Sequence, residues 1–226
     1  MEKVVAITGA FGILGSAVGS AFEAAGWRVA LLDVAPTPAM VRGEALLLGE
    51  VDLSSVSSAV HAIDRVVGHF GRLDALVNTA GGFCWETLAD GTLDTWDLMY
   101  RMNVRTAATA SKAALAHLPQ DGSGRIVNIA SASALKAGAG MGAYAASKSG
   151  VMRLTEALAE ESKGIGVTVN AVLPGIINTP QNRKDMPNAD FTNWVQPADI
   201  ANVIVFLASD AAQAVTGALI PVTGKL

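Results

Sequence analysis

Short aliphatic runs alternate with longer helical patterns along this chain of 226 residues, and that alternation most constrains the fold. Runs of about four to eight aliphatic residues between turn signals are typical of strands buried in a parallel sheet. Seven such runs are predicted as strands, over residues Val4–Ile7, Arg28–Leu32, Leu46–Val51, Ala75–Val77, Arg125–Ile129, Val167–Val172 and Ala218–Val222.

The helical patterns lie between these runs, over residues Leu14–Ala25, Ser54–Phe70, Thr92–Leu118, Ala143–Ser162 and Pro197–Leu207. Strands that alternate with helices predict an α/β, doubly wound Rossmann fold, here a seven-stranded parallel sheet with helices on both faces. The length fits a single domain, 1–226, that binds a dinucleotide. The irregular segment 176–196 contains Pro180 and Pro187, and we expect it to be the substrate loop.

Composition excludes several other classes of protein. Half of the residues are hydrophobic, and the net charge of −4 comes without a cluster of Lys and Arg, so no nucleic-acid partner is expected. The single cysteine, Cys84, excludes a disulfide framework and a Cys-rich metal site. No apolar run is long enough for a signal peptide or a membrane span, so we expect a cytoplasmic protein with no membrane partner and no metal.

A glycine-rich turn, Thr8–Gly15, follows the first strand and opens the first helix. In a dinucleotide site Gly9 would permit the tight turn, Gly12 would let the pyrophosphate approach the backbone, and Gly15 would let helix and strand pack closely. The N–H groups at the start of the helix would face the phosphates. The alternative is a turn that only joins strand to helix. Further cofactor contacts predicted here are Phe11, Ile13 and Leu14.

Asp33 ends the second strand, 18 positions after the last of these glycines. An acidic residue at about this distance binds the adenosine ribose hydroxyls and repels the 2′-phosphate of NADP. Neither Val34 nor Ala35 can bind a phosphate, so the predicted cofactor is NAD(H). The alternatives are an exposed Asp without a ligand, or an Arg42 guanidinium close enough to weaken the preference.

Tyr144 and Lys148 lie four positions apart in a predicted helix, which places them on one face. Free tyrosine has a pKa of about 10, and a nearby ammonium group lowers it, so that Tyr144 could exchange a proton with an alcohol or carbonyl oxygen. Ser131 follows the fifth strand, and its hydroxyl could hold the same oxygen. A Tyr–Lys pair alone is usually a surface or packing pair. The pair becomes a specific indication of an active site only when the glycine turn and this serine accompany it in the sequence.

Ser131, Tyr144 and Lys148, with the stretch Tyr-Ala-Ala-Ser-Lys, resemble the short-chain dehydrogenase/reductase family. The resemblance implies that Tyr144 is the general acid/base and that Ser131 orients the substrate oxygen. It implies that Lys148 lowers the pKa of Tyr144, and that Tyr144 and Lys148 both contact the cofactor. The stretch Met-Asn-Val around Asn103 is similar to the family segment whose Asn completes a proton relay to solvent.

Three further stretches resemble the family's cofactor-binding segments, at residues 51–53, 78–81 and 174–179. The resemblance implies that Asp52 binds the adenine amino group and that Asn78 stabilises the sheet and lines the cofactor. The other contacts it implies are Leu53, Ala80, Gly81, Pro174, Gly175, Ile177 and Thr179.

Residues flanking the predicted active site form a candidate substrate wall. The substrate contacts predicted are Phe83, Trp85, Ser133, Met141 and Asn178. The large apolar members, and Trp194 with them, fit a core role equally well. The helical stretches 92–118 and 143–162 are apolar on more than one face. This fits the family's habit of pairing these helices between subunits, which implies a homo-oligomer, either a dimer or a homotetramer.

The spacing of the glycines departs from the family's most common pattern, because Gly12 comes one place early. In this, and in residues 80–83 and 178–194, the chain is similar to the dihydropteridine reductase branch, which lacks the serine found here at Ser131. The leading hypothesis is an NAD(H)-dependent oxidoreductase that interconverts an alcohol and a ketone or aldehyde. The alternatives are an NADH-dependent dihydropteridine-type reductase and a non-catalytic nucleotide-sensing protein.

Overall fold

The computed structural model describes residues 2–39 and 44–225, and within them forms a sheet of seven parallel strands. The strands are β1 (Val4–Thr8), β2 (Arg28–Leu32), β3 (Leu46–Leu48), β4 (Ala75–Asn78), β5 (Arg125–Ile129), β6 (Thr168–Pro174) and β7 (Leu219–Val222). Their order is β3-β2-β1-β4-β5-β6-β7, so the direction of winding reverses between β1 and β4. The predicted doubly wound parallel sheet is confirmed.

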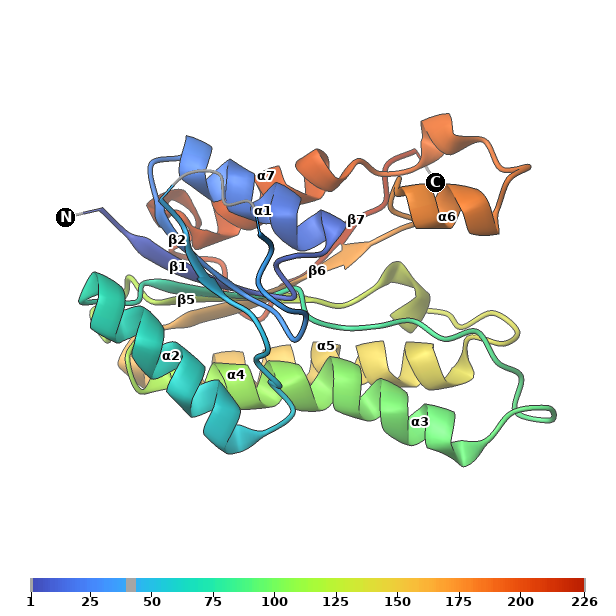
Figure 1. The fold of residues 1–226 in the computed structure, drawn as a ribbon, viewed down its shortest axis with the longest axis horizontal. Helices are drawn as coiled ribbons and strands as arrows, with labels where there is room; N and C mark the ends of the chain where they lie inside the picture. The colour runs from blue at the N-terminus through green and yellow to red at the C-terminus, as the bar shows by residue number, and fades with distance from the viewer. Residues whose placement is uncertain (1, 40–43, 226) are drawn as a thin grey trace.

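Helices cover both faces of the sheet (Figure 1). They are α1 (Ile13–Ala24), α2 (Val56–Phe70), α3 (Leu93–Met99), α4 (Thr106–Leu115), α5 (Gly142–Ser162), α6 (Pro180–Asp185) and α7 (Pro197–Ala208). α1 and α7 lie together on one face, and α2, α4 and α5 lie on the other. This coverage explains why β1, β4, β5 and β6 are buried along their whole length.

Among the described residues, two large apolar clusters and a smaller one between β6 and α5 fill the space between the sheet and its helices. Val5 and Ile7 of β1 pack in the cluster that includes α1 and α7. Val4 and Ala6 point the other way, into the cluster that includes α2 and α4. Because successive side chains of a strand point to opposite faces, a strand between two helical layers must be apolar throughout.

The helix predicted over residues 92–118 is interrupted. α3 ends at Met99, a π-helical turn covers Tyr100–Arg105, and α4 then continues to Leu115. A π-helical turn inserts extra backbone into the helix and is frequent at functional sites. Asn103 lies within this turn.

Other element boundaries also differ from the prediction, most by one or two residues. β3 ends at Leu48 rather than Val51, because Glu50 adopts a left-handed conformation with φ of 58° that a strand cannot continue through. The segment 176–196 contains the short helix α6, which begins at Pro180. Thr179 precedes this helix, and its hydroxyl accepts a hydrogen bond from the Asn182 N–H at 3.1 Å.

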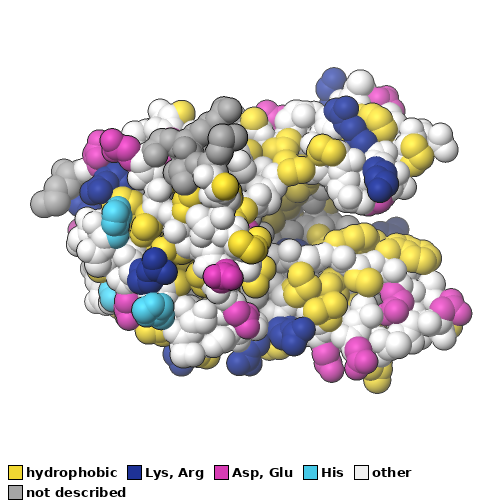
Figure 2. Space-filling model, in the orientation of Figure 1, with side chains coloured by type: hydrophobic (Ala, Val, Ile, Leu, Met, Phe, Trp, Pro, Cys, Tyr) yellow, Lys and Arg dark blue, Asp and Glu magenta, His cyan; other side chains and the backbone are white. Residues whose placement is uncertain are grey.

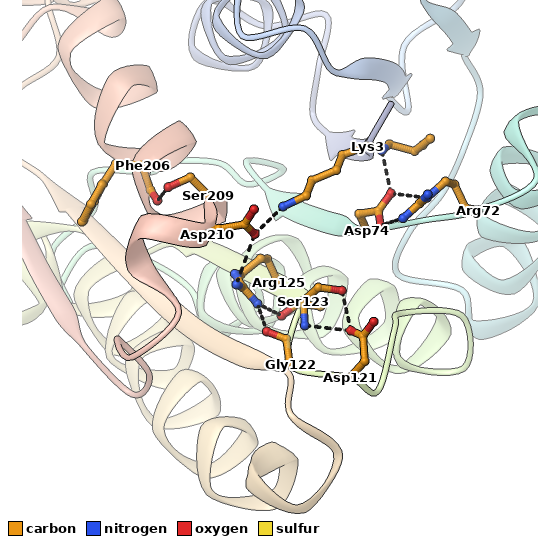
Figure 3. A network of polar contacts seen from close by, with 12 residues as sticks. Lys3, Arg72, Asp74, Asp121, Gly122, Ser123, Arg125, Phe206, Ser209 and Asp210 are labelled. Carbon is orange, nitrogen blue, oxygen red and sulfur yellow. Dashed lines mark hydrogen bonds and ion pairs between the residues drawn. The ribbon is translucent and has the colours of Figure 1, made fainter. Parts of the chain in front are cut away.

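Charged side chains lie at the amino ends of the central strands (Figure 3). Asp74, just before β4, is buried and accepts hydrogen bonds from the Val4 N–H at 2.8 Å and from Arg72 Nε at 2.8 Å. Arg125, the first residue of β5, is buried, with its Nη2 4.0 Å from Asp210 Oδ1. Burial lowers the pKa of Arg125, and the charge of Asp210 opposes that shift. These contacts join the starts of β1, β4 and β5 to the segment after α7.

Replacing Asp74 with Ala should lower the free energy of unfolding by about 2 to 4 kcal/mol, because the Val4 N–H loses a buried acceptor and Arg72 loses its partner. Urea denaturation measures the difference. The matched control is Glu160→Ala, which removes the exposed pair with Lys163 and should change the free energy by less than about 1 kcal/mol. Equal effects of the two changes would contradict the importance of the buried pair.

Candidate active site

A cleft of about 950 Å³ opens at the carboxyl ends of β1, β2 and β4, where the winding reverses. Figure 2 shows the molecule hollowed between the region of α6 and the helices of the opposite layer. Ligands of open parallel sheets bind at this position. Many predicted cofactor residues line the cleft, namely Gly9, Phe11, Gly12, Ile13, Leu14, Gly15, Asp33, Asp52, Leu53, Ala80, Gly81 and Thr179.

The glycine turn has the geometry of a phosphate cradle. Gly9 adopts a left-handed conformation with φ of 59°, and a side chain on it would overlap the backbone of Ala80. A side chain on Gly15 would overlap the backbone of Gly9. Among the described residues no side chain caps the first turn of α1, and that turn holds no acidic residue. Uncapped N–H groups and the helix dipole fit the pyrophosphate of a dinucleotide.

Asp33 connects the end of β2 to this turn. Its carboxylate accepts a hydrogen bond from the Phe11 N–H at 2.9 Å and one from the Ala35 N–H at 3.0 Å. The side chain is half-buried and lines the cleft, so it is not simply an exposed residue at a strand end. Arg42, the residue named as able to weaken the preference for NAD(H), lies outside the described residues.

Asp52 and Leu53 lie farther along the cleft wall. The Asp52 carboxylate accepts hydrogen bonds from the Ser54 hydroxyl at 2.7 Å and from the Ser54 N–H at 2.9 Å. These bonds hold the pKa of Asp52 below its ordinary value, and the charges of Arg101 and Arg105 add to the effect. The carboxylate is therefore ionised and fixed in direction, as an acceptor for an amino group must be.

Several cleft residues were not predicted as contacts from the sequence. They are Val34, Ala35, Val51, Ser54, Thr79, Leu98, Arg101, Met102 and Thr106. Leu98, Met102 and Thr106 are spaced by four residues around Asn103. This spacing on one helical face was the signal that could have placed them beside the cleft.

Six predicted cofactor contacts lie outside the cleft lining, and two of these, Tyr144 and Lys148, are described below. Asn78 is buried beneath the cleft and donates from Nδ2 to Ser111 Oγ at 3.0 Å and to Asn128 Oδ1 at 2.8 Å, so it holds β4 against β5. The others are Pro174, Gly175 and Ile177, at and after the end of β6. The sequence did not show that the Asn78 side chain points into the protein interior rather than into the cleft.

Lys148 is buried in α5 close to the cleft. Its Nζ donates a hydrogen bond to the Ile129 carbonyl, at the end of β5, at 2.9 Å. Burial lowers the pKa of Lys148 from 10.5 to about 8. Gly81 connects this residue to the cleft, since a Cβ atom on Gly81 would lie 3.2 Å from Lys148 Nζ and 2.5 Å from Asn103 Oδ1. Only glycine leaves room there for both polar side chains.

Asn103 is held by both ends of its amide. Its Oδ1 accepts from the Gly82 N–H at 2.9 Å, and its Nδ2 donates to the Gly82 carbonyl at 3.1 Å and to Ser147 Oγ at 2.9 Å. The Ser147 hydroxyl donates in turn to the Tyr144 carbonyl at 2.7 Å. The π-helical turn therefore places Asn103 between the cleft floor and the first turn of α5.

Tyr144 lies against Ser131. Burial raises the pKa of the Tyr144 phenol above its ordinary value of 10.0, and a hydrogen bond with Ser131 opposes that shift. The sequence predicted a lower pKa caused by Lys148. The structure differs because removal of the phenol from water is the larger effect. Ser131 Oγ also accepts from the N–H of Ser133 at 3.2 Å, which places Ser133 beside the Ser131 hydroxyl.

The apolar residues of the predicted substrate wall differ in burial, since some reach the surface and one lies in the core. Phe83 packs edge-on against the Tyr144 ring, with the centroids 4.9 Å apart, and Trp85 is exposed. Met141 is half-buried and immediately precedes α5. Trp194 is buried in the core, so for this residue the core interpretation is correct.

Asn178 anchors the predicted substrate loop. Its Oδ1 accepts from Arg183 Nε at 2.7 Å, and its Nδ2 donates to Gln196 Oε1 at 3.3 Å. These bonds tie the start of the segment 176–196 to α6 and to the segment's own end. Asn178 therefore supports the loop, and Thr179 beside it reaches the cleft.

The chain is similar to known proteins in sequence and in fold. The sequence model described as short chain dehydrogenase matches residues 3–190. The chain belongs to the short-chain dehydrogenase/reductase family. It is 34% identical to meso-2,3-butanediol dehydrogenase of Serratia marcescens over 99% of this chain and 94% of that protein. It is 32% identical to acetoacetyl-CoA reductase of Shinella zoogloeoides over 99% of this chain and 98% of that protein.

A solved structure of a Serratia marcescens short-chain dehydrogenase/reductase superposes with a TM-score of 0.88. Its sequence is 30% identical, and the match covers 99% of this chain and 97% of that one. This member of the family is thus an oxidoreductase with a nicotinamide-cofactor fold. Among residues 2–39 and 44–225 no three His, Cys, Asp or Glu side chains gather as a metal site, and no helix is long and apolar enough to cross a membrane.

Lys148→Met should change how stability depends on pH. The folded protein holds the Lys148 proton less tightly than the unfolded chain, so between pH 8 and 10.5 the unfolded chain binds more protons. The contribution of Lys148 to the free energy of unfolding therefore rises with pH across that window, by up to about 1.4 kcal/mol per pH unit. Subtracting the unfolding free energy of Lys148→Met from that of the wild type, at each pH, isolates the effect. The exposed-site control Lys112→Met should show no such slope, and a flat difference for Lys148→Met would contradict the burial argument.

Proposed function

We propose that this protein is an NAD(H)-dependent oxidoreductase that interconverts an alcohol and a ketone or aldehyde. The observation that carries the proposal is the placement of Tyr144 beside Ser131 and one helical turn from buried Lys148, next to a cleft that fits a dinucleotide. The names of the relatives support the reaction class, since one is a butanediol dehydrogenase and another an acetoacetyl-CoA reductase.

The preference for NAD(H) rests on Asp33. Two backbone N–H groups, of Phe11 and Ala35, fix its carboxylate at the cleft wall. A fixed negative charge there accepts ribose hydroxyl groups and repels a 2′-phosphate. The neighbours in the cleft lining, Val34 and Ala35, carry no positive charge that would attract one.

The proton chemistry belongs to four side chains. Ser131 and Tyr144 hold the substrate oxygen, and Tyr144 Oη gives the proton to a carbonyl or takes it from an alcohol. Because burial raises its pKa, Tyr144 rests as the neutral acid, which is the form that carbonyl reduction requires. The Lys148 ammonium favours the phenolate left after proton transfer. Asn103, bonded to Ser147 and to Gly82, which follows the cleft residue Gly81, positions the start of a relay toward solvent.

The bound nicotinamide would supply or accept the hydride, and the protein contributes position and electrostatics. The glycine turn would hold the pyrophosphate, Asp33 and Asp52 would hold the adenosine, and Lys148 would contact the nicotinamide ribose. We further propose that residues 1–226 act as one cytoplasmic domain, with 176–196 closing over a small-molecule substrate. The helices after β4 and β5 would pair subunits into a dimer or homotetramer.

Tyr144→Phe should reduce kcat for carbonyl reduction by about 100- to 10,000-fold, because no proton donor remains at the substrate oxygen. NADH binding should be retained. The measurement is NADH oxidation with a panel of ketones and aldehydes beside quinonoid dihydropterin. Tyr100→Phe, at an exposed tyrosine of the π-helical turn, is the matched control and should keep its activity.

Other outcomes of that panel decide between the hypotheses. Turnover confined to the pterin would contradict carbonyl chemistry and favour the dihydropteridine-type reductase, for which the early Gly12 is the supporting feature. NADH binding with no turnover of any substrate would favour a nucleotide sensor. Near-normal activity of Tyr144→Phe would overturn the role of the phenol.

Asp33→Asn should raise the ratio of kcat/KM with NADPH to kcat/KM with NADH by about tenfold or more, because a charge that repels the 2′-phosphate is removed. Asn keeps an oxygen that can accept the Phe11 N–H, so the turn is preserved, whereas Ala would lose this bond. Asp52→Asn is the control and should affect both cofactors equally. An unchanged ratio in Asp33→Asn would count against the assignment.

A further inference from the structure

Phe83 is an exposed aromatic residue fixed against the proton-transfer group. It follows β4, and 58% of its surface is accessible. Its ring meets the Tyr144 ring edge-on, with an interplanar angle of 82° and 4.9 Å between centroids. Edge-to-face pairing is a favoured geometry of aromatic rings, so Tyr144 sets the orientation of Phe83. The ring is thus held in place while much of its surface remains open to a ligand.

Trp85 is also exposed and also fixed, with 60% of its surface accessible. Its indole Nε1 donates to the Ala139 carbonyl at 3.0 Å. The adjacent Glu86 N–H donates to the Gly140 carbonyl at 2.9 Å. Gly140 has a φ of 72°, and a side chain on it would overlap the indole. The segment after β4 is therefore joined to the segment before α5 so that the indole rests on bare backbone.

The same two segments expose further large apolar side chains. Leu88 is 72% accessible and Leu135 is 62% accessible. Figure 2 shows hydrophobic side chains along the edges of the hollow on this side of the molecule. Large apolar side chains exposed together on two joined segments are typical of a surface that binds an apolar ligand.

We propose that Phe83 and Trp85 form an aromatic subsite that binds a flat aryl group attached to the substrate's carbonyl or carbinol carbon. The inference rests on the proposed function, and it names the substrate class as aryl ketones and the matching aryl alcohols. Phe83 is a specificity residue that acts by contact with this aryl group.

Shape distinguishes this subsite from a merely apolar surface. A phenyl ring presents a flat face and a positive edge that match fixed aromatic rings, whereas a cyclohexyl ring of similar size is puckered and lacks both. Simple burial in an apolar site would give the cyclohexyl compound equal or tighter binding, since it carries no fewer apolar groups. Preference for phenyl over cyclohexyl is therefore diagnostic of the aromatic contact.

The test measures the dissociation constants of acetophenone and cyclohexyl methyl ketone for the protein saturated with NAD⁺. No hydride is available in this complex, so binding is separated from turnover. The wild type should prefer acetophenone. Phe83→Leu should reduce that preference by about 3- to 10-fold, as expected for the loss of one aromatic pair. Phe83→Tyr should restore it. The matched control Phe206→Leu, at an exposed position on α7, should leave it unchanged.

Equal or tighter binding of the cyclohexyl ketone to the wild type, or a preference retained in Phe83→Leu, would overturn the aromatic subsite. Repeating the series with NADH tests the proposed function separately. Binding with the expected preference but no oxidation of NADH would support the subsite and count against carbonyl reduction. Reduction of both ketones without a Phe83-dependent preference would support the reaction and overturn the subsite.

Discussion

The close approach of two backbone turns is the constraint on which the site depends. Gly9, in the turn after β1, and Ala80, in the turn after β4, are so near that no side chain fits between them. The Thr79 hydroxyl donates to the Thr8 carbonyl, and the Ala80 N–H donates to the Thr8 hydroxyl. Because the winding reverses between these strands, this contact joins the cofactor cradle on one side to the segment bearing Gly81 on the other.

Gly81 carries that constraint into the catalytic group. It leaves room for Asn103 and Lys148, one from the π-helical turn and one from α5. Burying Lys148 destabilises its charged form, and the hydrogen bond that it donates to the Ile129 carbonyl directs Nζ toward the end of β5. The site thus concentrates polar groups in a region that would be more stable if it were apolar. At the opposite ends of the strands, buried Asp74 and its partly exposed partner Arg72 anchor the same sheet.

The proposed aromatic subsite depends on the same segment after β4, at the residues that follow Gly81. The segment after β4 continues from Gly81 through Phe83 to Trp85, and α5 brings Tyr144 to meet it. Gly140 then fixes Trp85 from the side of α5. The backbone path that borders the cleft therefore also fixes the proposed subsite, so the proposed cofactor and substrate positions are set together.

Local periodicity and the chemistry of single residues were enough to predict the α/β alternation, the glycine turn and the candidate residues Asp33, Ser131, Tyr144 and Lys148. The tertiary structure alone decided that the helix after β4 contains a π-helical turn, that Asn78 points beneath the cleft, and that the pKa of Tyr144 is raised. These features depend on burial and on contacts between segments distant in sequence, which no local pattern records.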